Sequence, residues 1–306
     1  MYFMDFIKRM TRKANIPVCI YLVLNIFVIT EIVSCVSGGM NFGQALLSGI
    51  ILYGISLIVA LSPIGEGILR LQTGCKKIKR AEQIDFIEPI FKEVYDKARE
   101  LDPSIPDDVQ LYMNTDKEPN AFATGRKTIC ITEGMLHMPE NQIKATLAHE
   151  FGHLAHKDTD LILVVSVGNL IVTAFILGIR LVIDFFHLVL NIFACLIGGS
   201  EGVIAAIVNA VYHLMVSAIV SGLTWVWTKI GMLLVMKSSR ANEYEADEFS
   251  FNLGYGNDLC VLLELFGDSS AKGLFANLAS SHPDKNDRIA KLQKLGATYR
   301  VTYGAK

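Results

Sequence analysis

Residues 146–156 read TLAHEFGHLAH, which places His149 and His153 four residues apart with Glu150 beside the first histidine. A preceding proline and the helical spacing of apolar residues predict a helix over 140–156. Positions four apart share one face of a helix, so both imidazoles can bind one zinc ion. Glu150 projects beside them, where it can take a proton from a water at that ion. This H-E-x-x-H spacing is typical of metallopeptidases, and a surface helix with two unrelated histidines is the alternative.

The composition of the chain indicates an integral membrane protein. Of its 306 residues 52% are hydrophobic and 19% are charged, and the mean hydropathy is +0.40. A soluble domain usually carries more charge, and here the apolar residues lie in blocks. The net charge of −2, without a long basic stripe, argues against nucleic acid as a partner. The six cysteines lie far apart without a C-x-x-C pair, which argues against a disulfide framework or a thiolate zinc site.

The apolar blocks predict about four transmembrane helices. The run 16–36 follows a basic opening and lacks a small-residue cleavage site, so we interpret it as a retained signal anchor. A second run, 45–62, precedes the basic stretch 70–80, so both ends of this hairpin are expected in the cytoplasm. The blocks 161–198 and 202–236 could hold two or four crossings, and two long helices fit their length better.

These blocks divide the chain into four parts. Residues 1–64 are expected to form an N-terminal transmembrane hairpin and 161–236 a second one. Residues 65–160, with the H-E-x-x-H helix, and 237–306 are each too small for a good core, so we expect them to pack together as one cytoplasmic domain. The expected fold is therefore mainly α, with a small mixed α+β domain at the membrane.

Several local elements follow from residue patterns. Apolar spacing predicts an amphipathic helix over 84–101, and β-branched alternation predicts strands over 109–113 and 128–132. In the third apolar block, Arg180 and Asp184 stand four residues apart and are expected to form an ion pair near a membrane interface.

A catalytic zinc needs a third protein ligand, and the sequence NEYEAD at 242–247 offers candidates. Glu243 has a carboxylate one helical turn on, Asp247, which can accept the second N–H of a ligating histidine. Glu245 and the nearby Glu248 have no carboxylate at the same spacing. We therefore predict Glu243 as the ligand and Asp247 as the residue that orients a histidine. An ordinary solvated helix face is the alternative.

HEFGH, then a membrane hairpin, then NEYEAD resembles the HtpX-type integral-membrane zinc metallopeptidases, which are relatives of the CAAX-prenyl proteases. Two further stretches are similar to the family pattern. NAFATG at 120–125 resembles the motif ahead of the active-site edge strand, and SHP at 281–283 followed by RI at 288–289 resembles the C-terminal signature. The resemblance implies a gluzincin fold and cytoplasmic cleavage of peptide bonds in misfolded or damaged membrane proteins, as part of quality control.

The same resemblance implies the site and its partners. One zinc ion per chain is expected on His149, His153 and Glu243, with Glu150 as the general base. The implied substrate is a polypeptide, above all a membrane protein, and an AAA-type membrane protease is the implied partner. The implied location is the plasma membrane, with several passes through the bilayer and both termini in the cytoplasm.

Three further residues correspond to family positions. The histidine and arginine on the oxyanion side correspond to His282 and Arg288, for which a helix start and a surface arginine are the alternatives. Asn120 is expected to hydrogen-bond a substrate backbone that adds as an extra strand beside 128–132. Its alternative is a plain turn residue, since turns favour asparagine.

Three other functions fit part of the sequence. A CAAX-like processing protease would share the motifs, but the relatives that do this are longer and have more spans around a chamber. A non-catalytic membrane scaffold with a structural metal site would not need every expected catalytic residue. A transporter usually shows internal repeats, and the sequence shows none.

Overall fold

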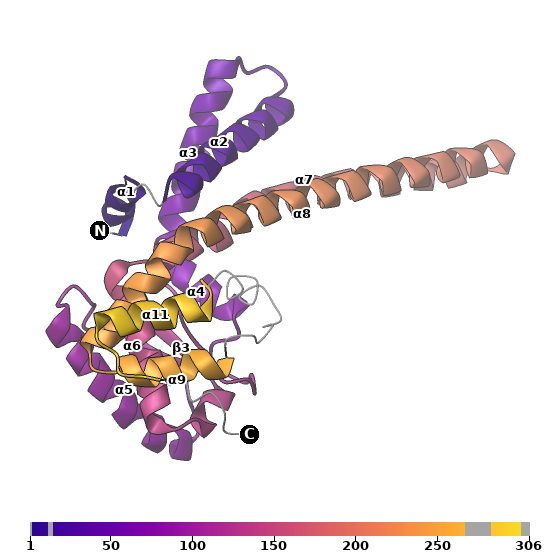
Figure 1. The fold of residues 1–306 in the computed structure, drawn as a ribbon. Helices are drawn as coiled ribbons and strands as arrows, with labels where there is room; N and C mark the ends of the chain where they lie inside the picture. The colour runs from indigo at the N-terminus through magenta and orange to yellow at the C-terminus, as the bar shows by residue number, and fades with distance from the viewer. Residues whose placement is uncertain (1, 12–14, 267–282, 301–306) are drawn as a thin grey trace.

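The computed structural model describes residues 2–11, 15–266 and 283–300, and these are mostly helical with one small sheet (Figure 1). Its elements in chain order are α1 (Tyr2–Met10), α2 (Ile16–Ser37), α3 (Phe42–Ala60), α4 (Pro63–Gln72), α5 (Ala81–Leu101), β1 (Gln110–Asn114), β2 (Ala121–Ala123), β3 (Thr128–Thr132), the 3₁₀ helix η2 (Glu133–His137), α6 (Glu140–His156), α7 (Thr159–Ile197), α8 (Gly199–Asn252), α9 (Gly256–Phe266) and α11 (Lys285–Leu295). The helix expected over 140–156 and the strand expected over 128–132 are confirmed.

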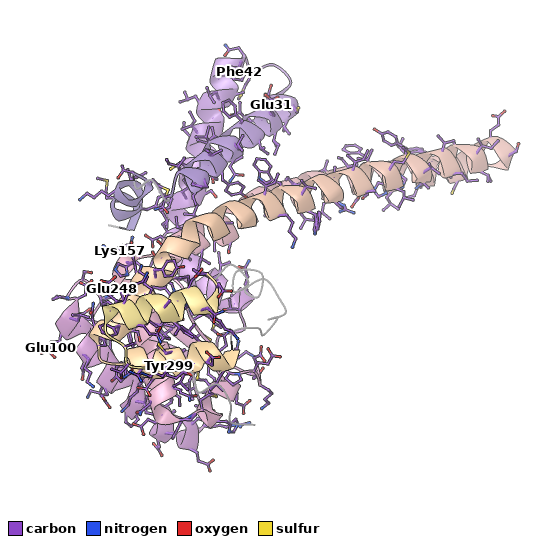
Figure 2. The ribbon with its side chains drawn as sticks, in the orientation of Figure 1. Glu31, Phe42, Glu100, Lys157, Glu248 and Tyr299 are labelled. Carbon is purple, nitrogen blue, oxygen red and sulfur yellow. The ribbon has the colours of Figure 1, made fainter. Side chains whose placement is uncertain are left out.

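Two apolar hairpins, α2–α3 and α7–α8, leave the domain that holds the sheet (Figure 1). Figure 2 shows Glu31 and Phe42 at the far end of the first hairpin, and Lys157 and Glu248 near the base of the second. By length and composition, four segments of the described chain can cross a membrane: Ile16–Ser37, Phe42–Ala60, Ile176–Leu196 and Gly199–Gly231. The expectation of several long apolar helices beside a small sheet is therefore confirmed.

Helix α8 continues without a break from Gly199 to Asn252. It therefore passes through the expected boundary between residues 236 and 237, and a single helix carries both the apolar segment and the sequence NEYEAD. The side chains of NEYEAD are thereby held at a fixed rotation relative to the apolar part of the same helix.

The prediction of an ion pair between Arg180 and Asp184 on α7 is wrong. The guanidinium of Arg180 instead donates hydrogen bonds to Ser217 and Ser221 on α8, at 2.6 and 3.1 Å. The carboxylate of Asp184 pairs with His213, also on α8. The four-residue spacing made the pair possible, but the neighbouring helix supplies other partners to both side chains.

The sheet has the strand order β1–β3–β2, with β1 parallel and β2 antiparallel to β3. Strand β3 is thus central, and all five of its residues are buried. The sequence led us to expect that a substrate strand adds beside 128–132. This expectation is wrong, because β1 and β2 already occupy both sides of β3. The strand that is open on one side next to α6 is β2.

The core of the domain joins the two parts of the chain that the second hairpin separates. Its buried cluster includes Phe91, Ile143 and Phe151 from before that hairpin and Phe249 and Ile289 from after it. Neither part holds this core alone, which agrees with the small size of each part.

A second buried cluster joins the bases of the two hairpins, with Leu57 on α3, Leu69 on α4 and Leu163 on α7 among its members. Farther along, Trp227 on α8 stacks against Tyr21 on α2 with their ring centroids 5.6 Å apart. The indole N–H of Trp227 also donates to Oδ1 of Asn25 over 2.8 Å. The first hairpin is thereby attached to α8 as well as to α7.

Candidate metal centre and active site

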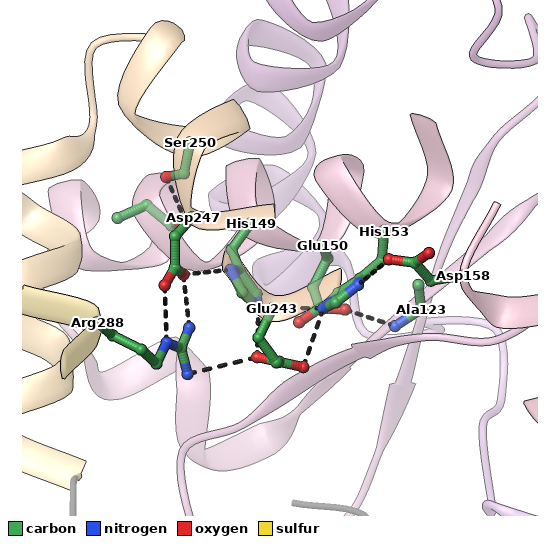
Figure 3. A network of polar contacts seen from close by, with 10 residues as sticks. Ala123, His149, Glu150, His153, Asp158, Glu243, Asp247, Ser250 and Arg288 are labelled. Atoms are coloured by element: carbon green, nitrogen blue, oxygen red, sulfur yellow. Dashed lines mark hydrogen bonds and ion pairs between the residues drawn. The ribbon is translucent and has the colours of Figure 1, made fainter. Parts of the chain in front are cut away.

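His149 and His153 on α6 and Glu243 on α8 each bring one possible ligand atom to a common point, with all of these atoms within 4.8 Å of one another (Figure 3). The two Nε2 atoms are 3.2 Å apart. Oε2 of Glu243 lies 3.5 Å from Nε2 of His149, and Oε1 of Glu243 lies 3.5 Å from Nε2 of His153. His149 and Glu243 are buried, whereas His153 is partly exposed.

Helices α6 and α8 approach closely because small residues face each other where they cross. A Cβ atom added to Gly152 would lie only 2.8 Å from the Cα of Ala246, so a larger residue would push the helices apart. Gly152 stands between the two histidines, and Ala246 stands three residues after Glu243, on the same face of its helix. The glycine of HEFGH therefore lets Glu243 reach the histidines.

Each histidine has a carboxylate at its other ring nitrogen. Nδ1 of His149 lies 3.0 Å from Oδ1 of Asp247, and Nδ1 of His153 lies 3.0 Å from Oδ2 of Asp158. In zinc sites such partners fix the ring orientation and turn the other ring nitrogen toward the metal. The structure thus places Asp247 beside His149 and Asp158, which the sequence reasoning missed, beside His153. That Asp247 orients a metal ligand stays a prediction.

Arg288 on α11 lies behind this cluster. Its Nε and Nη2 donate to the two oxygens of Asp247, at 2.8 and 2.6 Å, and its Nη1 lies 3.4 Å from Oε2 of Glu243. The guanidinium is buried together with both carboxylates. The surface alternative for Arg288 is therefore wrong, whereas the oxyanion role implied for it stays a prediction. His282, its expected companion, lies outside the described residues.

The charges of this cluster shift the pKa of its members. Burial opposes the charged form of His149, but the carboxylates of Asp247 and Glu243 outweigh it and raise the pKa to about 10. Burial also raises the pKa of Asp247, but Arg288 and then His149 lower it to about 2. The site therefore holds excess negative charge that favours a cation, and a divalent metal can take the place of the proton on His149.

The donor set fits zinc. Two imidazole nitrogens and one carboxylate are a known catalytic set for Zn²⁺, and they leave one position open for water. The acidic partner of each histidine is also typical of zinc sites.

Glu150 lies on α6 beside the two histidines of the candidate metal centre, and its Oε2 accepts a hydrogen bond of 2.8 Å from the main-chain N–H of Ala123 on β2. At the two ends of β2, the main-chain oxygen of Asn120 accepts a hydrogen bond from the N–H of Thr132, and the N–H of Thr124 donates to the main-chain oxygen of Thr128. Because main-chain groups alternate between the two sides of a strand, those of Ala121 and Ala123 point to the open side of β2. Glu150 and the open edge thus lie side by side (Figure 3).

Asn120 stands just before β2 with an exposed side chain. Its main-chain N–H donates to Oγ1 of Thr132 over 2.8 Å, so the residue helps to hold the start of β2 against β3. The contact predicted between its side chain and a substrate stays a prediction.

We expect Asp158→Asn to lower the affinity for zinc by about 10- to 100-fold, because the amide no longer holds His153 through a charged partner. Competition with a fluorescent chelator at fixed pH measures this affinity. Glu245→Gln is the matched control, since Glu245 lies on a partly exposed surface, where its carboxylate approaches His156 at 4.0 Å. Equal affinities of wild type and Asp158→Asn would show that Asp158 does not support the site.

Comparison with known proteins gives two findings. The model of one family, described as Peptidase family M48, matches residues 88–296, which is more than half of the chain. The chain is also similar to proteins named "Protease HtpX homolog". The one from Campylobacter hominis is 28% identical over 218 residues, which cover 60% of this chain and 68% of the relative. For that of Neisseria meningitidis serogroup B, the identity is 29% over 220 residues, with coverages of 65% and 70%. The homolog from Aeropyrum pernix is 31% identical over 168 residues, and the match covers 53% of this chain and 46% of that protein.

Proposed function

Because this chain belongs to peptidase family M48 and is a metallopeptidase of the HtpX type, we propose that it is a zinc endopeptidase that works from within a membrane. The convergence of His149, His153 and Glu243, with a carboxylate behind each histidine, carries this proposal. A structural zinc site would be closed by a fourth protein ligand, whereas three ligands leave the position that catalysis needs.

Bound zinc would act as a Lewis acid and would lower the pKa of a water at the open position. Glu150 would accept the proton of the attacking water and then deliver it to the leaving amine. Asp247 and Asp158 would keep the histidine rings oriented, and Arg288 would hold Asp247 and Glu243 in place. By the family resemblance, His282 and Arg288 are proposed to stabilise the oxyanion of the tetrahedral intermediate.

We further propose that a substrate polypeptide adds as a strand to the open edge of β2. The main-chain groups of Ala121 that point away from β3 are suited to such pairing. Since Ala123 donates to Glu150, a peptide on this edge would run directly past the base. Asn120, at the start of β2, would then contact the substrate backbone.

The proposed topology has four spans, with both termini and the active site in the cytoplasm of a plasma-membrane protein. His149 and His153 precede the second hairpin and Glu243 follows it, so the ligands can meet only if an even number of spans lies between them. Substrates would be misfolded or damaged membrane proteins in quality control, with an AAA-type membrane protease as partner. The apolar segments and the basic residues after the first hairpin support this orientation.

Metal removal tests the proposal. We expect the detergent-purified full chain to contain about one zinc per chain and to cleave β-casein or itself. Dialysis against 1,10-phenanthroline should abolish cleavage, and stoichiometric Zn²⁺ should restore it, because the chain's own groups cannot activate water alone. A zinc-loaded protein that cleaves neither substrate would contradict the proposal, as would cleavage that continues after the metal is gone.

A further inference from the structure

The turn between β2 and β3 is held by a buried glutamate from outside the sheet. Oε1 of Glu66 on α4 accepts a 2.9 Å hydrogen bond from the main-chain N–H of Arg126. Gly125 makes this approach possible: its φ is +73°, and a Cβ there would lie 2.3 Å from Cγ of Glu66. Glu66 is 2% exposed and sits in the first turn of the helix that directly follows the first apolar hairpin.

The side chain of Arg126 attaches the same turn to the second hairpin. Its Nε and Nη2 donate to the two carboxylate oxygens of Asp160, at 2.9 and 2.5 Å. Asp160 lies in the first turn of α7, two residues after the carboxylate that holds His153. The side chains of Arg126 and Asp160 are 8% and 0% exposed, so this fork is removed from water.

A third contact completes the attachment. Nη1 of Arg70 on α4 donates to Oγ1 of Thr128, the first residue of β3, over 3.0 Å. Helix α4 therefore holds the turn at two points, the main chain of Arg126 and the side chain of Thr128. Helix α7 holds it through the side chain of Arg126. A turn that only had to connect two strands would need no such set of buried charges, which are costly to remove from water.

The position of this turn decides the position of β2. Ala123, whose N–H donates to Glu150, precedes Arg126 by three residues, and β2 itself has only three residues. The position of so short a strand is set by what it is bonded to, which is β3 along its length and the attached turn at the end that carries Ala123.

We propose that Arg126 is a positioning residue for catalysis: through Asp160 and Glu66 it fixes the open edge of β2 relative to Glu150, so that the bases of both membrane hairpins form part of the frame that aligns the substrate. This inference rests on the proposed function. It adds that the site needs its membrane attachments to bind a peptide in register, even when the peptide itself is soluble.

The test compares purified, zinc-loaded full-length variants on a quenched fluorescent peptide taken from a β-casein site that the wild type cleaves. We expect Arg126→Gln to raise KM by about tenfold and to lower kcat/KM by about a hundredfold, because displacement of a positioning element by about 1 Å can cost that much. Zinc content should equal that of the wild type. Arg126→Lys, which keeps the charge but not the fork, should give an intermediate KM.

The double variant Arg126→Gln, Asp160→Asn is made in case the single variant does not fold, since it removes both charges of the buried fork and does not leave the Asp160 carboxylate without the Arg126 guanidinium. It should also show the raised KM. Lys127→Gln is the matched control in the same turn, because Lys127 only pairs with Asp108 at an exposed position, and its KM should not change. Loss of folded protein lowers the amount of active enzyme without changing KM. A wild-type KM in the folded single or double variant would overturn the proposal, whereas an inactive zinc-loaded wild type would instead contradict the proposed function.

Discussion

Glu150→Gln is expected to lower kcat for casein cleavage by about 10³-fold, within the range that a general base contributes. The glutamine amide has the size of the carboxylate, and its oxygen can still accept the N–H of Ala123, which now bonds Oε2 of Glu150. It cannot accept the proton of the attacking water. The proposed ligands His149, His153 and Glu243 remain, so the zinc content should stay at about one per chain.

The measurement is a kcat determination on wild type and variant, with zinc determined on the same samples. Glu245→Gln, on the partly exposed side of α8, is the control for the same chemical change away from the site. A variant that keeps zinc and retains a wild-type kcat would remove Glu150 from the mechanism. Loss of both zinc and activity would instead assign Glu150 a role in holding the metal.

Arg288→Gln is expected to weaken the site in two ways. The metal-free protein should lose about 3–5 kcal/mol of unfolding free energy, because Asp247 and Glu243 remain buried without the guanidinium that faces them. Zinc affinity should also fall by about 10- to 100-fold, since Asp247 would no longer be fixed against His149. Added zinc should recover part of the lost stability, because it binds the folded state.

Denaturant unfolding of the metal-free protein and chelator competition measure these two effects. Lys294→Gln, at an exposed position of the same helix α11, is the control and should change neither quantity. A residue that acted only on the substrate oxyanion would lower kcat and leave zinc affinity and stability unchanged. That outcome would contradict the positioning role that we assign to Arg288.

Some of the fold could be predicted because the pattern repeats over a long enough stretch. Helix α6 carries helical spacing over 17 residues after a proline, and its observed bounds match the expected ones. The pairing of Glu243 with Asp247 on one face followed from a four-residue spacing, which holds wherever the local structure is helical.

Strand β2 could not be predicted for a physical reason. Its sequence Ala-Phe-Ala is too short to show alternation, and alanine has a low preference for strands. It becomes a strand because it pairs with the buried β3, a contact between segments that a local pattern does not contain. The error about which strand forms the open edge follows from this omission.

The acidic partner of His153 was missed for a related reason. Asp158 comes after the end of α6, where Lys157 adopts a left-handed conformation with φ of 58°. That reversal turns the chain back toward His153, and a spacing rule that assumes a continuing helix does not anticipate it. A charged residue directly after a histidine-rich helix end is the signal that could have raised the possibility.

The unbroken course of α8 restricts how the length of this chain can vary. The helix is anchored at Trp227 against α2 and at Ala246 against α6. One inserted or deleted residue between these anchors would rotate Glu243 by about 100° and move it by about 1.5 Å along the axis. Insertions and deletions should therefore be tolerated near Gly198, where α7 and α8 meet. They should be excluded between the two anchors, because even seven residues, which nearly restore the rotation, would shift one anchor by about 10 Å along the axis.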